Sequence, residues 1–318
     1  MRAMNVWLLI CGGLLISLVS ACYAADVGHK REPVLTLETQ ELSIRAGRLT
    51  RSYLLHLPPA VSQSKPLPVV IALHGGGGSG ERIMETTYLN EKADKEGFIA
   101  IYPDGTGKKL LMRKGFFTWN AGDCCGDAHK EKVDDVEFIR TLLNSIQATL
   151  PVDPKRIYVA GLSNGGSMAY RLGCELSDRF AAIAVVSGDF NFESCRPANS
   201  VPVIVFHGTA DDHVPYEGGV GERSLVKAHR KPVSFAVSYW VKHNGTATVP
   251  QKEERGSIVK ETYGKGKDDA EVILYTIRGG GHVWPGGVKG KWQGAPEPTR
   301  EISATDLMWE FFQRHPKK

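Results

Sequence analysis

One pentapeptide, Gly161-Leu162-Ser163-Asn164-Gly165, combines a hydroxyl nucleophile with glycines two residues to either side. The apolar run before it, residues 157–160, predicts a buried strand, and the residues after it open a helical stretch. On a sharp strand-to-helix turn a serine hydroxyl stands clear of the backbone, and the flanking glycines avoid side-chain clashes. The pattern alone arises by chance roughly 0.2 times in a chain of this composition, so its strand-and-helix context carries the assignment. Ser163 is therefore the candidate nucleophile.

A second glycine-rich segment, residues 74–80, directly follows the predicted strand at residues 69–73. A nucleophilic serine needs backbone N–H groups aimed at the oxyanion that forms when it attacks a carbonyl, and glycines permit the close approach. We predict that Gly76 and Asn164 supply these N–H groups, each worth ~3 kcal/mol in the transition state. A phosphate-binding loop is the alternative, but the segment lacks the Gly-Lys-Ser/Thr ending of such loops.

An acid and a base follow Ser163 in the chain, each placed after a predicted strand. Asp211 follows the strand at residues 201–206, and His282 follows the strand at residues 272–277. His282 would take the Ser163 proton and return it to the leaving alcohol, while Asp211 would hold the imidazole tautomer. Asp212 is the nearest competitor for the acid role. Asp211 is preferred because it has the Asp-x-x-Val-Pro placement typical of folds with this order of catalytic residues.

The other histidines near these strands are expected to be structural. His74 and His207 each precede a glycine at a strand end, which predicts hydrogen bonds to loop backbone, and His213 is expected at the surface. A plain loop histidine is the alternative reading of His282. Its glycine-rich turn, residues 279–286, at the last predicted strand favours the base.

The sequence pattern predicts that the elements positioning these residues are strands alternating with amphipathic helices. This alternation predicts an α/β fold: one mostly parallel central sheet with helices on both faces, in a single domain spanning residues 33–318. Residues 133–150 have helical spacing, with Asp134 and Asp135 at the helix N-terminus, and Ser303-x-x-Asp306 predicts the cap of a last helix. Residues 35–57 look like antiparallel strands at the sheet's leading edge. Buried strands are expected at 69–73, 98–102, 157–160, 181–186, 201–206 and 272–277.

Composition fits one large globular domain and argues against a nucleic-acid partner. The 318 residues are 42% hydrophobic and 23% charged, and 39 basic against 35 acidic residues give a formal charge of +4. Basic residues form no run interleaved with aromatics, which nucleic-acid binding would require.

The residue pattern at the N-terminus is typical of a targeting segment. Arg2 precedes an apolar run from Val6 to Val19 that is shorter than a membrane-spanning helix, so residues 1–24 are expected to be a signal peptide. Cleavage after Ala24 would leave a soluble periplasmic or extracellular protein. The alternative is a bacterial lipobox ending at Cys22, whose lipid would anchor the mature chain to a membrane.

Four of the six cysteines lie in the body of the chain, where an oxidising compartment would pair them. Four cysteines allow three connectivities. Cys174 and Cys195 flank one predicted helix–strand unit and could bridge easily. Cys124 and Cys125 are adjacent, with Cα atoms only ~3.8 Å apart, so a bridge between them would be strained but is allowed. Metal ligation is disfavoured, because no second Cys/His cluster lies at zinc-like spacing.

Six segments carry a further signal: Leu73-His74-Gly75-Gly76, Trp119-Asn120-Ala121-Gly122-Asp123-Cys124-Cys125-Gly126, Val133-Asp134-Asp135-Val136, Gly161-Leu162-Ser163-Asn164-Gly165-Gly166, His207-Gly208-Thr209-Ala210-Asp211 and Gly281-His282-Val283-Trp284-Pro285-Gly286. Together they resemble the polyhydroxybutyrate depolymerase and feruloyl esterase group of carbohydrate esterase family one, within the α/β-hydrolase superfamily. The resemblance runs from about Leu54 to the C-terminus. It implies the same triad of Ser163, Asp211 and His282, and it further implies that Trp119 and Trp284 line the substrate cleft, although both could instead be core aromatics.

These observations predict a secreted serine esterase that works through an acyl-enzyme on hydroxyalkanoate esters or oligomers. A feruloyl or acetylxylan esterase acting on plant polysaccharide is the alternative, because the motifs are shared. No metal or organic cofactor is required by this route. A non-catalytic binding module is disfavoured by the complete triad, and a peptidase by the lack of room for a propeller or cap.

Overall fold

The computed structural model describes residues 39–63, 65–110, 113–192, 194–224 and 226–318. The predicted signal peptide, including Cys22, and the first residues of the predicted domain lie outside the described residues. In the described part of the chain, no helix combines the length and the apolar character needed to cross a membrane.

Ten strands of the described chain form one sheet in the order β1-β2-β4-β3-β7-β8-β9-β12-β11-β10. The six strands from β4 to β12 pair in parallel. Most of these central strands are buried along their whole length, because helices cover both faces and leave no polar side. The prediction of a mostly parallel sheet is thus confirmed. The central strands are β4 (Ile99–Pro103), β3 (Leu67–Leu73), β7 (Val152–Leu162), β8 (Ala182–Val186), β9 (Val203–Gly208) and β12 (Val272–Ile277).

Antiparallel strands close both edges of the sheet. β1 (Gln40–Ala46) and β2 (Leu49–His56) form the leading edge, as predicted. β11 (Ile258–Tyr263) and β10 (Gln251–Arg255) form the other edge and were not predicted. Every residue of β10 is exposed, so it carries none of the apolar alternation that marks a strand in sequence. A separate hairpin, β5 (Thr106–Leu110) and β6 (Arg113–Thr118), leaves the sheet after β4.

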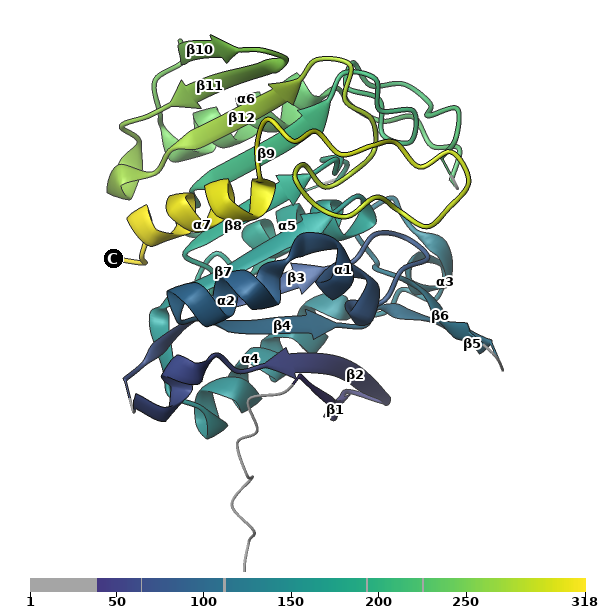
Figure 1. Cartoon of the computed structure of the whole chain (residues 1–318), viewed down its shortest axis with the longest axis vertical. Helices are drawn as coiled ribbons and strands as arrows, with labels where there is room; N and C mark the ends of the chain where they lie inside the picture. The colour runs from purple at the N-terminus through teal and green to yellow at the C-terminus, as the bar shows by residue number, and fades with distance from the viewer. Residues whose placement is uncertain (1–38, 64, 111–112, 193, 225) are drawn as a thin grey trace, which may run out of the picture. The chain divides into compact units, whose positions relative to one another are not determined.

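Helices pack on both faces of the sheet (Figure 1). α4 (Asp135–Thr149), α5 (Asn164–Glu175) and α6 (Val233–Asn244) share one hydrophobic core with one face. α1 (Gly80–Thr87), α2 (Leu89–Glu96) and α7 (Ala304–Arg314) share a second core with the other face. The short α3 (Gly126–Lys130) lies by the β5–β6 hairpin. Two 3₁₀ turns cover Pro59–Gln63 and Lys267–Asp269.

The residues predicted at the N-termini of two helices lie there in the structure. The Asp134 carboxylate accepts the Glu137 N–H at 2.9 Å and caps α4, and the Ser303 hydroxyl accepts the Asp306 N–H at 3.1 Å and caps α7. Asp135 lies in the first turn of α4, at the helix N-terminus as predicted, and its side chain is fully buried. Its carboxylate lies 2.8 Å from the Arg51 guanidinium on β2, because a buried charge requires a partner.

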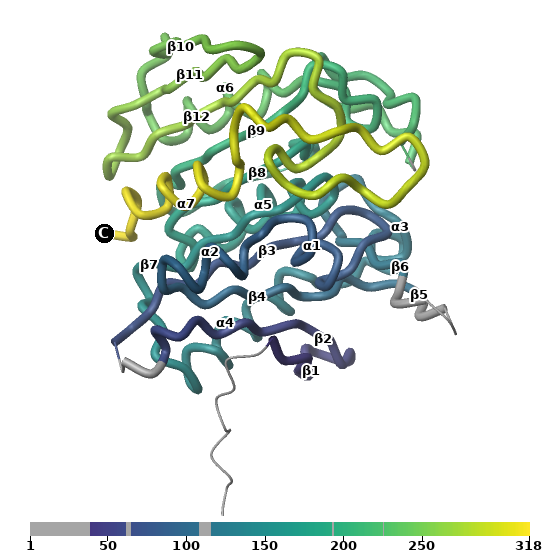
Figure 2. Tube along the Cα trace, in the orientation of Figure 1, coloured from purple at the N-terminus to yellow at the C-terminus, as the bar shows by residue number. Residues whose placement is uncertain are grey.

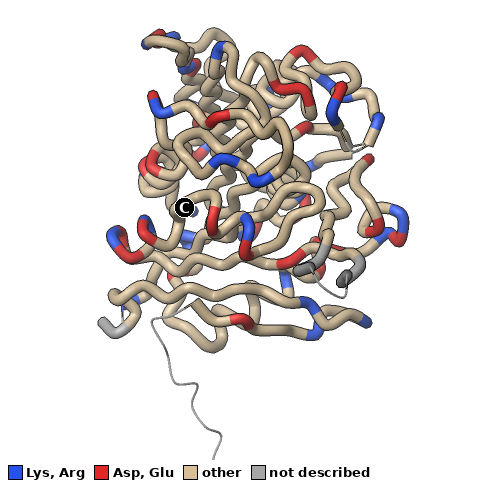
Figure 3. Tube along the Cα trace, turned by 45° about the vertical axis from the view of Figure 1, so that its right-hand side comes forward, with Lys and Arg blue, Asp and Glu red and all other residues tan. Residues whose placement is uncertain are grey.

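The loops that follow the carboxyl ends of the parallel strands lie together at one end of these strands. Figure 2 shows that the long segment from β12 to α7 extends to this end of the strands, beside the segment that follows β9. In the view of Figure 3, Lys and Arg are interspersed with Asp and Glu over the visible loops. In open α/β sheets, ligands bind at the carboxyl ends of the strands.

Candidate active site

Ser163 occupies the turn between β7 and α5, with backbone angles φ 57° and ψ −123°. A non-glycine residue with positive φ costs about 1–3 kcal/mol, so the surroundings must hold it there. A Cβ on Gly161 would lie 2.1 Å from the Gly165 oxygen, and a Cβ on Gly165 would lie 2.3 Å from the Leu73 oxygen. Both glycines are therefore required for the turn to pass so close to its neighbours, which agrees with the reason for their spacing in the sequence.

The glycine loop after β3 lies directly against this turn. A Cβ on Gly75 would lie 3.3 Å from the Ser163 Cβ and 3.9 Å from its Oγ, and a Cβ on Gly76 would lie 3.7 Å from the Asn164 Cβ. Gly77 and Gly78 donate their N–H groups to Phe117 and Gly75. Among the described residues, no acceptor takes the N–H of Gly76 or of Asn164. These two N–H groups are thus available to a ligand beside Ser163.

The Asn164 side chain stabilises the turn through hydrogen bonds to a distant segment. Its amide bonds both backbone groups of Trp119, and the Trp119 indole N–H donates to the His74 oxygen at 3.0 Å. His74 donates from Nδ1 to the Gly75 oxygen and accepts the Gly105 N–H at Nε2, so it bonds loop backbone as predicted. Burial lowers the pKa of His74 to about 4, which keeps the ring neutral.

The expectation that two tryptophans line the cleft is corrected by their burial. Trp119 is 0% exposed and Trp284 is 1% exposed, so neither offers a surface to a substrate. Trp284 donates its indole N–H to the Thr305 hydroxyl at 3.0 Å and packs in the core beneath α7. Both are core aromatics whose polar N–H is satisfied inside the protein.

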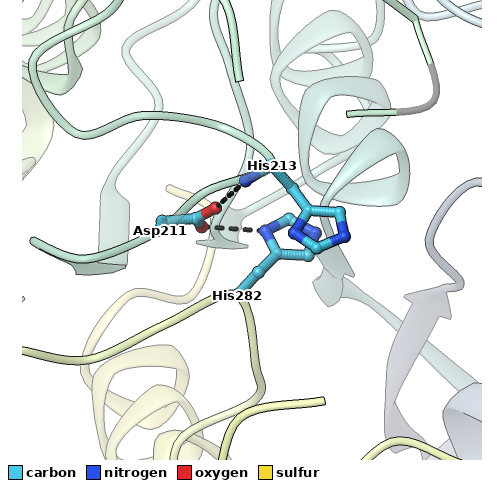
Figure 4. Close-up of side chains that lie close together, drawn as sticks. All are labelled: Asp211, His213 and His282. Atoms are coloured by element: carbon cyan, nitrogen blue, oxygen red, sulfur yellow. Dashed lines mark hydrogen bonds and ion pairs between the residues drawn. The ribbon is translucent and has the colours of Figure 1, made fainter. Parts of the chain in front are cut away.

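Asp211 and His282 meet although they are 71 residues apart (Figure 4). His282 Nδ1 donates to Asp211 Oδ2 at 2.8 Å, while Asp211 Oδ1 accepts the N–H groups of His213 and Val214 at 2.9 and 2.8 Å. Burial alone would raise the pKa of the Asp211 carboxyl, but the charge of His282 and its hydrogen bond hold that pKa well below its ordinary value. The carboxylate is therefore ionised and fixed, and its bond leaves His282 Nε2 for another partner.

Asp212 does not share this role. Its carboxylate contacts His213 Nδ1 at 2.6 Å and faces outward. Potential ligand atoms of Asp211, His213 and His282 lie within 4.8 Å of one another. Both oxygens of Asp211 already accept N–H bonds, so the group fits a carboxylate that orients an imidazole better than it fits a metal ligand set.

His213 is the residue of this group that the sequence did not identify. It was expected at the surface, but its ring is stacked on His282, with centroids 4.6 Å apart and planes 14° apart (Figure 4). His207 matches its prediction, because its Nε2 bonds the Val214 oxygen at 2.7 Å. The only sequence signal for His213 was its position two residues after Asp211.

An exposed aromatic also borders the glycine loop. Phe116 on β6 is 53% exposed, and its ring covers Gly77, where a Cβ would lie 2.6 Å from a ring carbon. Two backbone hydrogen bonds join the neighbouring Phe117 to Gly77 and Gly78. The hairpin thus fixes an apolar surface beside the N–H groups near Ser163, which no motif in the sequence indicated.

A buried polar network holds the first turn of α5. The Ser167 hydroxyl donates to Asp189 Oδ1 at 2.5 Å, and Arg230 Nη1 donates to Asp189 Oδ2 at 2.6 Å. Arg230 Nη2 lies 3.9 Å from Cys124 Sγ. Ser167 also donates its N–H to the Ser163 oxygen at 2.9 Å, so this network is connected directly to the nucleophile turn.

Two disulfides are present among the described residues. Cys174 in α5 is bonded to Cys195, with Cα atoms 5.1 Å apart, which confirms the predicted bridge. Cys124 and Cys125 are bonded to each other, which selects one of the three connectivities that the sequence left open. The first bridge ties the end of the nucleophile helix to the segment after β8, and such a link restricts the unfolded chain.

Comparisons with known proteins agree with this geometry. The family model described as Esterase PHB depolymerase matches residues 51–225. Feruloyl esterase B from Piromyces equi is 33% identical over 243 residues, which cover 73% of this chain and 42% of that protein. The chain thus spans less than half the length of this relative.

Two solved structures share the fold at low sequence identity. An acetyl xylan esterase from Aspergillus awamori superposes with a TM-score of 0.59 at 16% identity, over 87% of this chain and 99% of the other. A CE1 ferulic acid esterase from Anaeromyces mucronatus, solved with ferulic acid, superposes with a TM-score of 0.53 at 14% identity, over 90% and 93%. These likenesses confirm the predicted α/β-hydrolase fold. The family model spans more than half of the chain, and it leads to one conclusion: the chain belongs to the Esterase PHB depolymerase family.

Proposed function

We propose that this protein is a serine esterase, with Ser163 as nucleophile, His282 as base and Asp211 as the acid that orients it. The observation that carries the proposal is the 2.8 Å hydrogen bond from His282 to a buried, ionised Asp211. Asp211 and His282 follow the carboxyl ends of the parallel strands β9 and β12, and the strained Ser163 turn follows that of β7. A strained serine, an oriented imidazole and a fixed carboxylate are the parts that acyl transfer requires.

The reaction then follows two acyl-transfer steps. Ser163 Oγ attacks the ester carbonyl carbon while His282 Nε2 takes the hydroxyl proton. The bond to the alcohol breaks, and His282 returns the proton to the departing oxygen, which leaves an acyl-enzyme. Water, deprotonated by His282, attacks the acyl carbon in the second step, and the proton returns to Ser163 as the acid departs.

The free N–H groups of Gly76 and Asn164 support the same reaction. Both lie against the Ser163 turn, and both lack an acceptor among the described residues. As the carbonyl oxygen gains negative charge, these fixed donors stabilise it more than they stabilise the neutral ester. This difference lowers the barrier to the tetrahedral intermediate.

The substrate class has two candidates within this reaction. The name of the matching family supports hydroxyalkanoate esters or oligomers. A feruloyl or acetylxylan ester is the second candidate, supported by the 33% identical relative named feruloyl esterase B. The exposed Phe116 offers an apolar contact to either acyl group.

We also propose that the mature protein acts outside the cytoplasm. The apolar N-terminal run and the two disulfides support export to an oxidising compartment, as a soluble protein or with a lipid on Cys22.

One panel tests the activity and separates the substrates. kcat/KM of the purified mature protein is measured on 3-hydroxybutyrate oligomers, methyl ferulate and acetylated xylan, with Ser163→Ala as blank and Ser43→Ala on the exposed face of β1 as matched control. Ser163→Ala should lose at least about 10³-fold in kcat while Ser43→Ala keeps the wild-type rate. Wild-type turnover by Ser163→Ala would refute the nucleophile. Preference for hydroxybutyrate oligomers would establish the first substrate class, and preference for feruloyl or acetyl esters the second.

A further inference from the structure

His213 touches both members of the Asp211–His282 pair, in two different ways. Its backbone N–H donates to Asp211 Oδ1 at 2.9 Å, on the carboxylate oxygen that His282 does not use. Its ring lies face to face with the His282 ring, with centroids 4.6 Å apart (Figure 4). The His282 ring is thus in contact with Asp211 at its Nδ1 edge and with His213 along its face.

The His213 ring has a hydrogen-bond partner of its own. Its Nδ1 is bonded to Asp212 Oδ1 at 2.6 Å, and Asp212 Oδ2 lies 3.8 Å from the Arg223 guanidinium. Arg223 donates to the carbonyl oxygens of Gln293 and Gly294 at 2.6 and 3.1 Å. Gln293 and Gly294 belong to the segment between β12 and α7 that also carries His282. This chain of contacts joins the loop of the acid to the loop of the base.

The charges around His213 favour its neutral form. Burial and the neighbouring His282 lower the pKa of His213, while the hydrogen bond and charge of Asp212 and the charge of Asp211 raise it, and the net shift is downward. Two further titratable or charged groups lie beside this arrangement: Arg223 is 3.8 Å from Asp212 Oδ2, and His207 Nε2 is 3.5 Å from Asp211 Oδ2. At neutral pH the ring packed on His282 is therefore uncharged.

We propose that His213 is a positioning residue for His282: its ring holds the base in the orientation that hydrogen-bonds Asp211, and it must be neutral for His282 to accept the Ser163 proton. This inference rests on the proposed function, in which His282 is the base.

Two physical effects underlie this role. A ring packed flat on the imidazole blocks rotation of His282 about its Cβ–Cγ bond away from Asp211, and small losses of orientation reduce rates steeply. A protonated His213 would place a second positive charge beside the imidazolium that forms in the transition state. Like charges at this separation repel, so protonation of His213 in acid should reduce the rate.

Two variants separate packing from charge. His213→Ala removes the ring, whereas His213→Phe keeps a flat ring that cannot be protonated. The half-exposed Asp212 remains solvated in both, so loss of its partner should have little effect on folding. His243→Ala is the matched control, because His243 is a partly buried histidine whose ring is stacked on Tyr239 in α6.

The measurements are kcat, KM and the pH dependence of kcat/KM, with thermal unfolding and circular dichroism as checks of folding. We expect His213→Ala to lower kcat about tenfold with KM nearly unchanged, and His213→Phe to stay within about threefold of wild type. Below neutral pH, log(kcat/KM) of wild type should fall with a slope steeper than one per pH unit. The slope should be shallower in His213→Phe, because a phenylalanine ring cannot be protonated.

The outcomes distinguish this inference from the proposed function. If His213→Ala keeps wild-type kcat and an unchanged acid slope while His282→Ala is inactive, the role of His213 is refuted and the triad stands. If His282→Ala keeps full activity, both are refuted. Should His213→Ala fail to fold, an acid slope in His213→Phe equal to that of wild type would refute the charge effect by itself.

Discussion

The Asn164 side chain forms two hydrogen bonds with the backbone of Trp119. Its Oδ1 accepts the Trp119 N–H at 2.7 Å, and its Nδ2 donates to the Trp119 carbonyl oxygen at 3.1 Å. The residue that follows the nucleophile is thereby locked to a segment 45 positions earlier. Since the Asn164 N–H is one of the two proposed oxyanion donors, this brace fixes the donor's direction as well as the turn.

Asn164→Ala should therefore lower both stability and activity. The buried backbone groups of Trp119 would lose their partners, at about 1–3 kcal/mol in the free energy of unfolding, and kcat should fall about tenfold. Asn244 is a matched control, because its amide bonds both backbone groups of Val201 at 3.0 and 2.7 Å, ahead of β9 and away from the proposed site. Urea unfolding of Asn244→Ala should show a similar loss with kcat unchanged. Equal losses of kcat in both variants would contradict a specific role for the Asn164 brace.

Asp211→Asn should lower kcat by about 10³–10⁴-fold with little change in fold. An amide in this position would turn a donor toward His282 Nδ1 or favour the wrong imidazole tautomer, so the base would lose its orientation. The adjacent Asp212→Asn should change kcat by no more than about fivefold, because Asp212 contacts His213 and not His282. Steady-state kinetics of the two variants decide the matter, and a larger effect at Asp212 would reverse the assignment of the acid.

Gly75→Ala should reduce kcat about 10- to 100-fold while the protein still folds. The added Cβ would lie 3.3 Å from the Ser163 Cβ, so the nucleophile or the glycine loop must shift by a few tenths of an ångström. At Gly264, a Cβ meets nothing within 4 Å, which makes Gly264→Ala the control. Kinetics and circular dichroism of both variants test this expectation. A wild-type kcat in Gly75→Ala would contradict it, because the glycine loop could then shift without loss of activity.

Stability should fall as the pH is lowered from about 6.5 to about 4, in part because of His74. Burial lowers the pKa of His74 to about 4 in the folded protein, against an ordinary value of 6.5. Between these values the unfolded chain binds a proton that the folded protein does not, so acid favours unfolding, by up to about 3 kcal/mol. Urea unfolding at several pH values measures the loss. The decline should be shallower in His74→Gln, and an equally steep decline would assign it to other groups.

Phe116→Ala should raise KM about threefold or more with a smaller effect on kcat, because the ring offers apolar surface beside the glycine loop but touches no reacting group. Phe235→Ala on α6 is the control, since Phe235 is another exposed phenylalanine. KM values on methyl ferulate and on hydroxybutyrate oligomers provide the measurement. An unchanged KM on both substrates would exclude contact between Phe116 and the acyl group.

The central sheet and the Ser163 turn could be predicted because local features specify them. The six runs buried on both faces had to be apolar, and the glycines flanking Ser163 had to lack a Cβ, since one there would lie within 2.1–2.3 Å of backbone oxygens. The caps of α4 and α7 were equally local, because each depends on a hydrogen bond between residues three apart. Chain order and strand ends then singled out Asp211 and His282 before their contact was known.

Tertiary structure alone decided the surroundings of these residues. The stacking of His213 on His282, the burial of Trp119 and Trp284 and the pairing of Asp135 with Arg51 join positions from different elements. The exposed edge strand β10 likewise depends on its partner β11, since its own residues are uniformly polar. The physical reason is common to all of them: sequence pattern reports the surface that an element must bury, whereas the side chain that meets that surface is chosen only when distant segments pack together.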